Sequence, residues 1–209
     1  NSSINTDIMN FLSIDCSTEI GFLFIKVENK TFNQTLQSDK YNNDLLMKRI
    51  LDFLDKNNLK LEYISKIFVN QGPGNFSGLR GSLATAKGIS LAKKIRLFGY
   101  NTFLWSCTKF FNQNKNIFSI INFRGKYFIK NYSKDLKIVS KAKEVTKEEI
   151  IKNNSNSFKV VPRHLIKSFD KDILKLKNLN VVDLDHNELE FLQSKGLLDE
   201  DFIKPLYLS

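Results

Sequence analysis

The sequence predicts a protein of two α/β lobes. Short apolar runs typical of strands alternate with a segment of helical periodicity at residues 43–57, and a glycine-rich loop precedes a second helix. The chain has 209 residues, of which 42% are hydrophobic, so it can bury a sizeable core without disulfides or metals. We expect a first lobe over residues 9–100 and a smaller second lobe over residues 101–209.

The first lobe is expected to open with three strands. Residues 10–27 contain two runs of strand formers on either side of the polar turn 15–19, and residues 30–37 form a third, antiparallel strand. The next elements are a helix over 43–57, a strand over 64–70, a helix from the glycine-rich loop to about Lys94 and a strand over 95–100.

The second lobe is expected to begin with a helix over residues 102–112 and a hairpin. The apolar runs 117–122 and 127–132 flank the turn dipeptide Arg124-Gly125, which is a hairpin signal. The rest of the lobe is Lys-rich and less sharply patterned. It is expected to contain a capped helix over 146–152, a strand near 158–161 and a short helix near 186–194.

The composition excludes a mainly disordered chain, a collagen and a disulfide scaffold. No apolar run approaches the ~20 residues that a membrane helix needs. Residues 1–8 lack Lys and Arg and precede no long apolar core, so we interpret them as an extension or an expression remnant before a start at Met9, not as a signal peptide. The only cysteines, Cys16 and Cys107, are expected to be free thiols in a reducing cytoplasm.

The net charge of +10 admits an acidic partner, of which nucleic acid is the usual one. Only five of the 32 cationic residues are Arg, and the lysines are spread over both halves without an Arg-rich patch. Lys, Asn, Ile and Phe are also the residues that an AT-rich genome over-supplies. Direct nucleic-acid binding by this chain alone therefore stays an alternative.

Gly72, Gly74, Gly78 and Gly81 lie between a predicted strand and a predicted helix, where a loop can aim backbone N–H groups at an anion. Three named sites fit poorly here. No Lys follows Gly78 as a P-loop requires, Ser77 is one place too late for a nucleophile elbow, and the next strand lacks the acidic residue of a dinucleotide site.

The helix after this loop has small residues along one face, namely Gly78, Gly81, Thr85, Gly88 and Ala92, spaced three, four, three and four apart. An interior glycine costs a helix ~1 kcal/mol relative to Ala, so a close approach to the backbone must offset that cost. The approaching element is either the chain's own sheet or a helix of a partner. The sequence leaves both open.

Few residues offer catalytic chemistry. Neither His164 nor His186 has a second His three or four residues away or a neighbouring Cys, so no metal site is expected. Nothing raises a Ser–His–Asp triad above background. Asp15 ends the first strand, where a nucleotide site would hold a metal-bound phosphate, but the turn Asp15-Cys16-Ser17 lacks the usual Asp-x-Gly. An Asp that caps its own turn is the alternative.

Three segments resemble the TsaB (YeaZ-type) protein family. They are residues 10–18, the glycine segment Gly72-Pro73-Gly74-Asn75-Phe76-Ser77-Gly78-Leu79-Arg80-Gly81, and the closing Pro205-Leu206-Tyr207-Leu208. The resemblance is strong over roughly residues 9–105 and weak afterwards, apart from the predicted hairpin and the closing segment. Asn42 and Asn122 depart from it, because they stand where the family often has His and Asp.

The resemblance implies a two-lobed actin-like ATPase fold with mixed sheets flanked by helices. It implies a non-catalytic cytoplasmic subunit that binds the TsaD-type catalytic subunit and works with a TsaE-type ATPase. The complex installs threonylcarbamoyl on the tRNA adenosine next to the anticodon, so tRNA is reached indirectly. A homodimer of the lone chain, ATP or ADP at the partner interface and the absence of a bound metal are further expectations.

The family builds its partner and self-association surface from the two long helices of the first lobe, here residues 43–57 and 77–94. The interface residues implied are Leu46, Ile50, Phe53, Gly78, Gly81, Thr85, Gly88 and Ala92. The signature-loop residues are Gly72, Pro73, Gly74, Asn75, Ser77, Gly78 and Arg80, and a vestigial nucleotide contact would be Asp15 with Ser17.

Three other functions stay open. The first is a small nucleotide-binding ATPase or kinase that uses Asp15 and the glycine loop, which an ATP titration would test. The second is a protease-like hydrolase, against which the missing His pair and the displaced Ser77 argue. The third is an RNA-binding module, for which the salt dependence of tRNA binding is the test.

Overall fold

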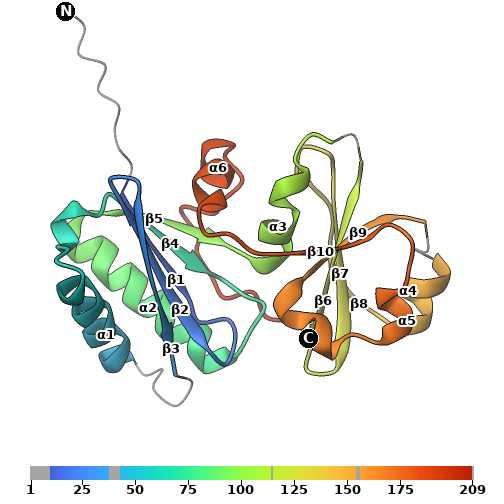
Figure 1. Ribbon diagram of the computed structural model, residues 1–209, viewed down its shortest axis with the longest axis horizontal. Helices are drawn as coiled ribbons and strands as arrows, with labels where there is room; N and C mark the ends of the chain where they lie inside the picture. The colour runs from blue at the N-terminus through green and yellow to red at the C-terminus, as the bar shows by residue number, and fades with distance from the viewer. Residues whose placement is uncertain (1–9, 38–42, 114, 154–155, 209) are drawn as a thin grey trace, which may run out of the picture. The chain divides into compact units, whose positions relative to one another are not determined.

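The computed structural model describes residues 10–37, 43–113, 115–153 and 156–208 (Figure 1). Residues 1–8 and Asn42, on which two expectations rest, lie outside the described residues. The chain divides into two compact units. The first unit contains residues 1–100 and Leu198–Tyr207, and the second contains residues 101–197 and 208–209. The closing segment Leu198–Tyr207 thus differs from the expectation, which placed it in the second lobe.

The first unit contains a mixed five-stranded sheet with the order β3-β2-β1-β4-β5. β1 pairs with β2 and β2 with β3 in antiparallel fashion, while β1–β4 and β4–β5 are parallel. The strands are β1 (Phe11–Asp15), β2 (Gly21–Val27), β3 (Lys30–Leu36), β4 (Lys66–Asn70) and β5 (Arg96–Tyr100). All five were predicted, because each is a local run of strand formers bounded by a turn.

Helices α1 (Asn43–Lys56) and α2 (Phe76–Lys93) cover one face of this sheet (Figure 1). Their apolar side chains and alternate residues of β1, β2, β4 and β5 form the core of the unit. A short 3-10 helix, η2 (Leu61–Tyr63), precedes β4. The other sheet face presents aromatic rings, with Phe11 edge-on to Phe68 at a centroid distance of 5.1 Å.

The second unit contains another mixed five-stranded sheet, with the order β10-β9-β6-β7-β8. Its strands are β6 (Ile117–Phe123), β7 (Lys126–Tyr132), β8 (Ile138–Val145), β9 (Phe158–Pro162) and β10 (Leu179–Val182). Its helices are α3 (Thr102–Cys107), η3 (Thr108–Phe110), α4 (Lys147–Asn153), η4 (Arg163–Ser168), α5 (Lys171–Leu174) and α6 (Glu188–Ser194). The β6–β7 hairpin is confirmed, and Gly125 at φ 77° supplies the left-handed backbone of its turn.

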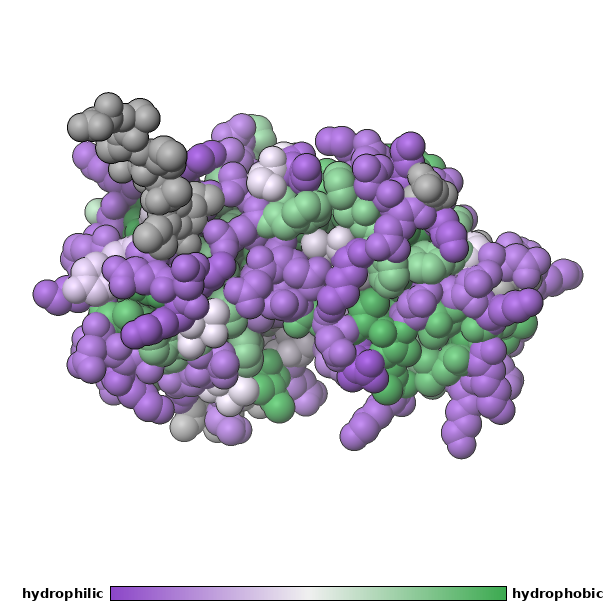
Figure 2. All heavy atoms as spheres, turned by 45° about the horizontal axis from the view of Figure 1, so that its top comes forward, coloured by the Kyte–Doolittle hydropathy of each residue, from purple (hydrophilic) through white to green (hydrophobic). Residues whose placement is uncertain are grey.

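Four elements of the second unit escaped the sequence prediction, namely β8, β10, η4 and α5. β8 is an edge strand whose residues 138–141 are all exposed, so it lacks the apolar alternation of a half-buried strand. The predicted helix 102–112 is instead the six-residue α3 followed by η3. Hydrophilic residues cover much of the surface in Figure 2, and no helix within the described ranges is long and apolar enough to span a membrane.

Candidate functional site

The glycine loop packs against the β1–β2 turn of its own unit. A Cβ added to Gly74 would lie 2.2 Å from the Ser17 carbonyl oxygen, and one added to Gly78 would lie 2.5 Å from the Cys16 carbonyl oxygen. The backbone N–H of Asn75 donates to the same Ser17 oxygen at 3.3 Å. Gly74 and Gly78 therefore serve a close contact with the chain's own β1–β2 turn, so for Gly78 the approaching element belongs to the chain itself.

The polar side chains at the ends of β1 and β4 bond to one another. Asp15 Oδ1 accepts from the Ser17 backbone N–H at 3.0 Å and from the Ser17 hydroxyl at 2.6 Å. Asn70 donates to Ser17 Oγ at 3.3 Å and accepts from the Gly72 N–H at 2.8 Å. Asp15 thus caps its own turn, and a continuous set of hydrogen bonds links that turn to the glycine loop.

Cys16 lies between Asp15 and Ser17 but offers no nucleophile. Its side chain is fully buried, and burial is the main cause that raises the pKa of its thiol to about 12, with the charge of Asp15 acting in the same direction. Cys107 in the second unit is also a buried free thiol. Both cysteines behave as small hydrophobic residues.

The closing segment holds the glycine loop from the other side. The Leu206 N–H donates to the Gln71 carbonyl at 2.6 Å, and Gln71 Nε2 donates to Asp199 and to the Lys204 carbonyl, both at 3.1 Å. At the start of α2, Phe76 stacks on Tyr207 with a centroid distance of 5.3 Å. Arg80 lies over the Phe76 ring at 5.0 Å. The predicted signature loop and the closing segment are therefore brought together.

The predicted interface residues divide into two groups. Leu46, Ile50 and Phe53 of α1 are at most 2% exposed and belong to the hydrophobic core of the first unit. Their part of the prediction is corrected, because side chains that fill the core are not available to a partner. On α2, Gly78, Gly81 and Thr85 are also buried, whereas Gly88 and Ala92 are exposed.

A hollow of about 290 Å³ lies where α1, η2 and α2 meet. The lining residues of this α2 hollow are Met47, Leu61, Ala84, Thr85, Gly88, Ile89, Ala92 and Lys93. Gly88 has no atom within 4 Å of the position that a Cβ would occupy. Thr85 is only 8% exposed, and its Oγ1 has no hydrogen-bond partner among the described residues. The hollow therefore combines an apolar wall, an open helix backbone and one unsatisfied hydroxyl.

Of the residues that line this hollow, Thr85, Gly88 and Ala92 were predicted from the sequence, and Met47 and Leu61 were not. The small-residue spacing of α2 was the signal for the first group. Met47 and Leu61 come from α1 and η2, so only the packing of three elements reveals them. Ala84, four residues before Gly88, continues the small-residue face and was available to the same argument.

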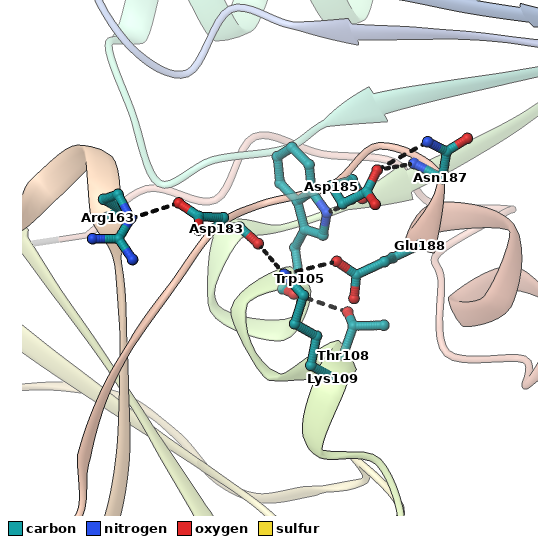
Figure 3. A network of polar contacts seen from close by, with 8 residues as sticks. All are labelled: Trp105, Thr108, Lys109, Arg163, Asp183, Asp185, Asn187 and Glu188. Atoms are coloured by element: carbon teal, nitrogen blue, oxygen red, sulfur yellow. Dashed lines mark hydrogen bonds and ion pairs between the residues drawn. The ribbon is translucent and has the colours of Figure 1, made fainter. Parts of the chain in front are cut away.

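A polar network in the second unit joins α3 and η3 to the segment after β10 (Figure 3). Lys109 Nζ donates to the Asp183 carbonyl at 2.5 Å and lies 3.5 Å from Glu188 Oε1. Trp105 Nε1 donates to the Asp185 carbonyl at 2.9 Å. Burial raises the pKa of Glu188, and the charge of Lys109 opposes that shift. Most of these bonds end on backbone carbonyls, which indicates that the network fixes a chain segment.

The two histidines lie in different surroundings. His186 is buried with its ring edge-on to Trp105 at a centroid distance of 4.8 Å, whereas His164 is exposed in η4. Within the residues that the structure describes, no three His, Cys, Asp or Glu side chains form a group that could hold a metal ion.

Comparison with known proteins gives a family and a fold. A family model described as TsaD, tRNA N6-adenosine threonylcarbamoyltransferase, matches residues 29–158. A Buchnera aphidicola (subspecies Baizongia pistaciae) protein named tRNA threonylcarbamoyladenosine biosynthesis protein TsaB is 31% identical over 111 residues, which are 52% of this chain and 49% of that protein. The match thus spans about half the length of that relative.

Two solved structures from Pseudomonas aeruginosa share the architecture. One is an uncharacterized protein with similarity to peptidase YeaZ, at a TM-score of 0.70 and 16% identity, with 97% of this chain and 100% of that chain covered. The other is YeaZ, at a TM-score of 0.68 and 16% identity, with 96% and 100% covered. At this identity the likeness concerns the fold, and it confirms the predicted two-lobed actin-like α/β class.

Proposed function

Since the chain belongs to the TsaD family, described as tRNA N6-adenosine threonylcarbamoyltransferase, with TsaB and YeaZ proteins among its relatives, we propose that it is a non-catalytic subunit that binds a TsaD-type catalytic subunit. In the cytoplasm, together with a TsaE-type ATPase, it supports threonylcarbamoyl modification of the tRNA adenosine next to the anticodon. The observation on which this proposal rests is the α2 hollow.

The α2 hollow has the properties of a docking site for an apolar side chain of a partner helix. Gly88 and Ala92 leave the helix backbone open to close approach, and Leu61 and Met47 supply apolar contact. A buried hydroxyl without a partner is costly, and a partner group that bonds to Thr85 Oγ1 would remove that cost. The same surface would serve a homodimer of the lone chain, so the TsaD-type subunit and a second copy compete for it.

The non-catalytic role is supported by the way the candidate reactive groups are used. Asp15 and Ser17 bond to each other, and Cys16 is a buried thiol with a pKa of about 12. The Ser17 carbonyl is covered by Gly74. In this proposal ATP or ADP binds at the interface with the partner, where the partner contributes the groups that this unit lacks.

The test is light scattering behind a sizing column, with the chain alone and mixed with the TsaD-type protein of the same organism. The variant Gly88→Leu fills the hollow, and Lys87→Leu is the matched control, because Lys87 is exposed on the same helix and does not line the hollow. We expect Gly88→Leu to weaken the complex by at least ~10-fold and Lys87→Leu by less than ~3-fold. Circular dichroism checks that both variants are folded.

Three outcomes would contradict the proposal at different levels. Absence of a complex at tens of micromolar, with ATP and the TsaE-type subunit present, would rule out the partner. A complex that forms equally well with Gly88→Leu would leave the partner in place and remove the α2 hollow as its docking site. Modification of tRNA by the lone chain would contradict the non-catalytic role.

A further inference from the structure

The positive charge of the chain is concentrated in the second unit. Residues 101–197 and 208–209 contain 18 Lys and Arg against 10 Asp and Glu, a net charge of +8, whereas the first unit has 14 against 12, a net charge of +2. The two units differ in net charge because the second contains more Lys and Arg and fewer Asp and Glu than the first. A unit with this imbalance attracts polyanions.

The edge strand β8 and the turn before it form one strongly basic segment of this unit. Residues 134–143 contain Lys134, Lys137, Lys141 and Lys143, all exposed, against one acidic residue, Asp135. Asp135 accepts a hydrogen bond from Ser133. Among the described residues no salt bridge is formed by the four lysines, although Lys137 lies near enough to Asp135 to lower the pKa of that carboxyl group.

Apolar side chains lie between these cations. Ile138 is 61% exposed and Val139 is 54% exposed, at the start of a strand whose outer edge faces no other strand of the sheet. Figure 2 shows hydrophilic side chains that project from the second unit, on the right, around areas of hydrophobic residues. In such a segment the lysines can bind phosphates, and the exposed apolar side chains can contact riboses or bases.

We propose that the β8 segment, residues 134–143, is a direct contact surface for the phosphate backbone of tRNA. The inference rests on the proposed function, which makes tRNA the substrate of the complex, and it adds a contact that the sequence analysis assigned only indirectly. Each unpaired lysine neutralises one phosphate and releases its counterion, so the surface positions the tRNA and does not read its sequence.

A purely structural role for these lysines is protection of the sheet edge. Charged side chains on an edge strand prevent pairing with other chains. Edge protection accounts for Lys141 and Lys143, but it does not account for Lys134 and Lys137, which precede the strand, or for the exposure of Ile138 and Val139.

The experiment measures tRNA affinity by fluorescence anisotropy as a function of salt, for the full chain and for its complex with the TsaD-type subunit. The variant Lys134→Gln/Lys141→Gln/Lys143→Gln is compared with the matched control Lys171→Gln/Lys175→Gln/Lys177→Gln. The control removes the same charge from exposed positions in and just after α5 of the same unit. Circular dichroism and complex formation by light scattering are recorded for both variants.

We expect the β8 variant to bind tRNA at least ~10-fold more weakly and to reduce the slope of log affinity against log salt by about 2, because each lost phosphate contact removes about 0.7–0.9. The control is expected to change affinity by less than ~3-fold with an unaltered slope. Both variants should still bind the TsaD-type subunit.

Equal losses of tRNA affinity in the two variants would overturn the proposal, because long-range charge would then explain the binding. An unchanged affinity in both variants would overturn it as well. Binding of the chain to an acidic peptide such as poly-glutamate, without binding to tRNA, would overturn the proposal in favour of an acidic protein partner. If the chain binds tRNA but forms no complex with the TsaD-type subunit, only the proposed function is contradicted.

Discussion

Gly74 and Ser17 are in direct backbone contact, so close that a Cβ at position 74 would lie 2.2 Å from the Ser17 carbonyl oxygen. Because that oxygen belongs to the backbone of the β1–β2 turn, it cannot move aside as a flexible side chain would. The contact explains why this loop needs a glycine at position 74 without any bound anion.

Gly74→Ala is expected to destabilise the chain by about 3 kcal/mol, since the new methyl group forces the loop and the turn apart. Urea denaturation followed by circular dichroism measures the loss. A variant as stable as the parent chain would show that the two segments separate without cost. If the variant does not fold at all, Gly74→Ala is introduced into a Gly88→Ala background, which is expected to be more stable, and compared with Gly88→Ala alone.

Gly88→Ala is expected to have the opposite sign. No atom lies within 4 Å of the Cβ position and the residue is in the interior of α2, so the substitution should stabilise the lone chain by about 0.5–1 kcal/mol through helix propensity. The same denaturation experiment checks this. A loss of stability would mean that position 88 is already packed within the chain.

The two cysteines are expected to resist alkylation in the folded chain. Burial raises the pKa of Cys16 to about 12 and that of Cys107 further, so neither thiol ionises between pH 7 and pH 9. Iodoacetamide labelling followed by mass spectrometry should find both thiols unmodified in buffer and both modified in urea. Labelling in buffer that rises from pH 7 and levels off towards pH 9 would indicate an accessible thiol of ordinary acidity.

Glu188→Gln is expected to change the pH dependence of stability. Burial raises the folded-state pKa of Glu188, so its contribution is fully present below the ordinary carboxyl pKa and is lost as the pH rises through the folded value. The melting temperature of the variant, relative to the parent chain, should therefore be higher at pH 7 than at pH 4. Glu148→Gln, at an exposed position of α4, is the control and should show no such difference. A relative melting temperature that falls between pH 4 and pH 7 would mean that the Lys109 ion pair outweighs burial.

The parts of the fold that the sequence predicts are those with local signals. The strand β1, the Gly125 turn and helix α2 each carry their pattern within a few residues, and each lies where it was expected. The edge strand β8 was missed because exposure on both sides removes the alternation on which strand prediction depends. The family resemblance also assigned Leu46, Ile50 and Phe53 of α1 to the interface, whereas their side chains fill the chain's own core, which the resemblance alone could not distinguish.

Non-local packing accounts for the rest of what the sequence could not predict. The α2 hollow depends on Leu61 and Met47 reaching the same place as Gly88, and the position of the closing segment depends on Gln71. Neither contact produces a periodic pattern within a single segment of the sequence, so neither could be predicted from it. The contact between Gly74 and Ser17 was visible only as an unexplained glycine, because 57 positions separate the two residues in the sequence.

The return of residues 198–207 to the first unit has a consequence for the order in which this protein is assembled on the ribosome. Gly99 at the edge strand β5 exchanges hydrogen bonds of 2.7 and 3.0 Å with Asp199, and the Gln71 side chain bonds to Asp199 and Lys204. A nascent chain that has emerged only as far as β10 therefore still lacks those partners for Gly99 and Gln71. The unit that is synthesised first is therefore completed only after residues 101–197 of the second unit have been synthesised.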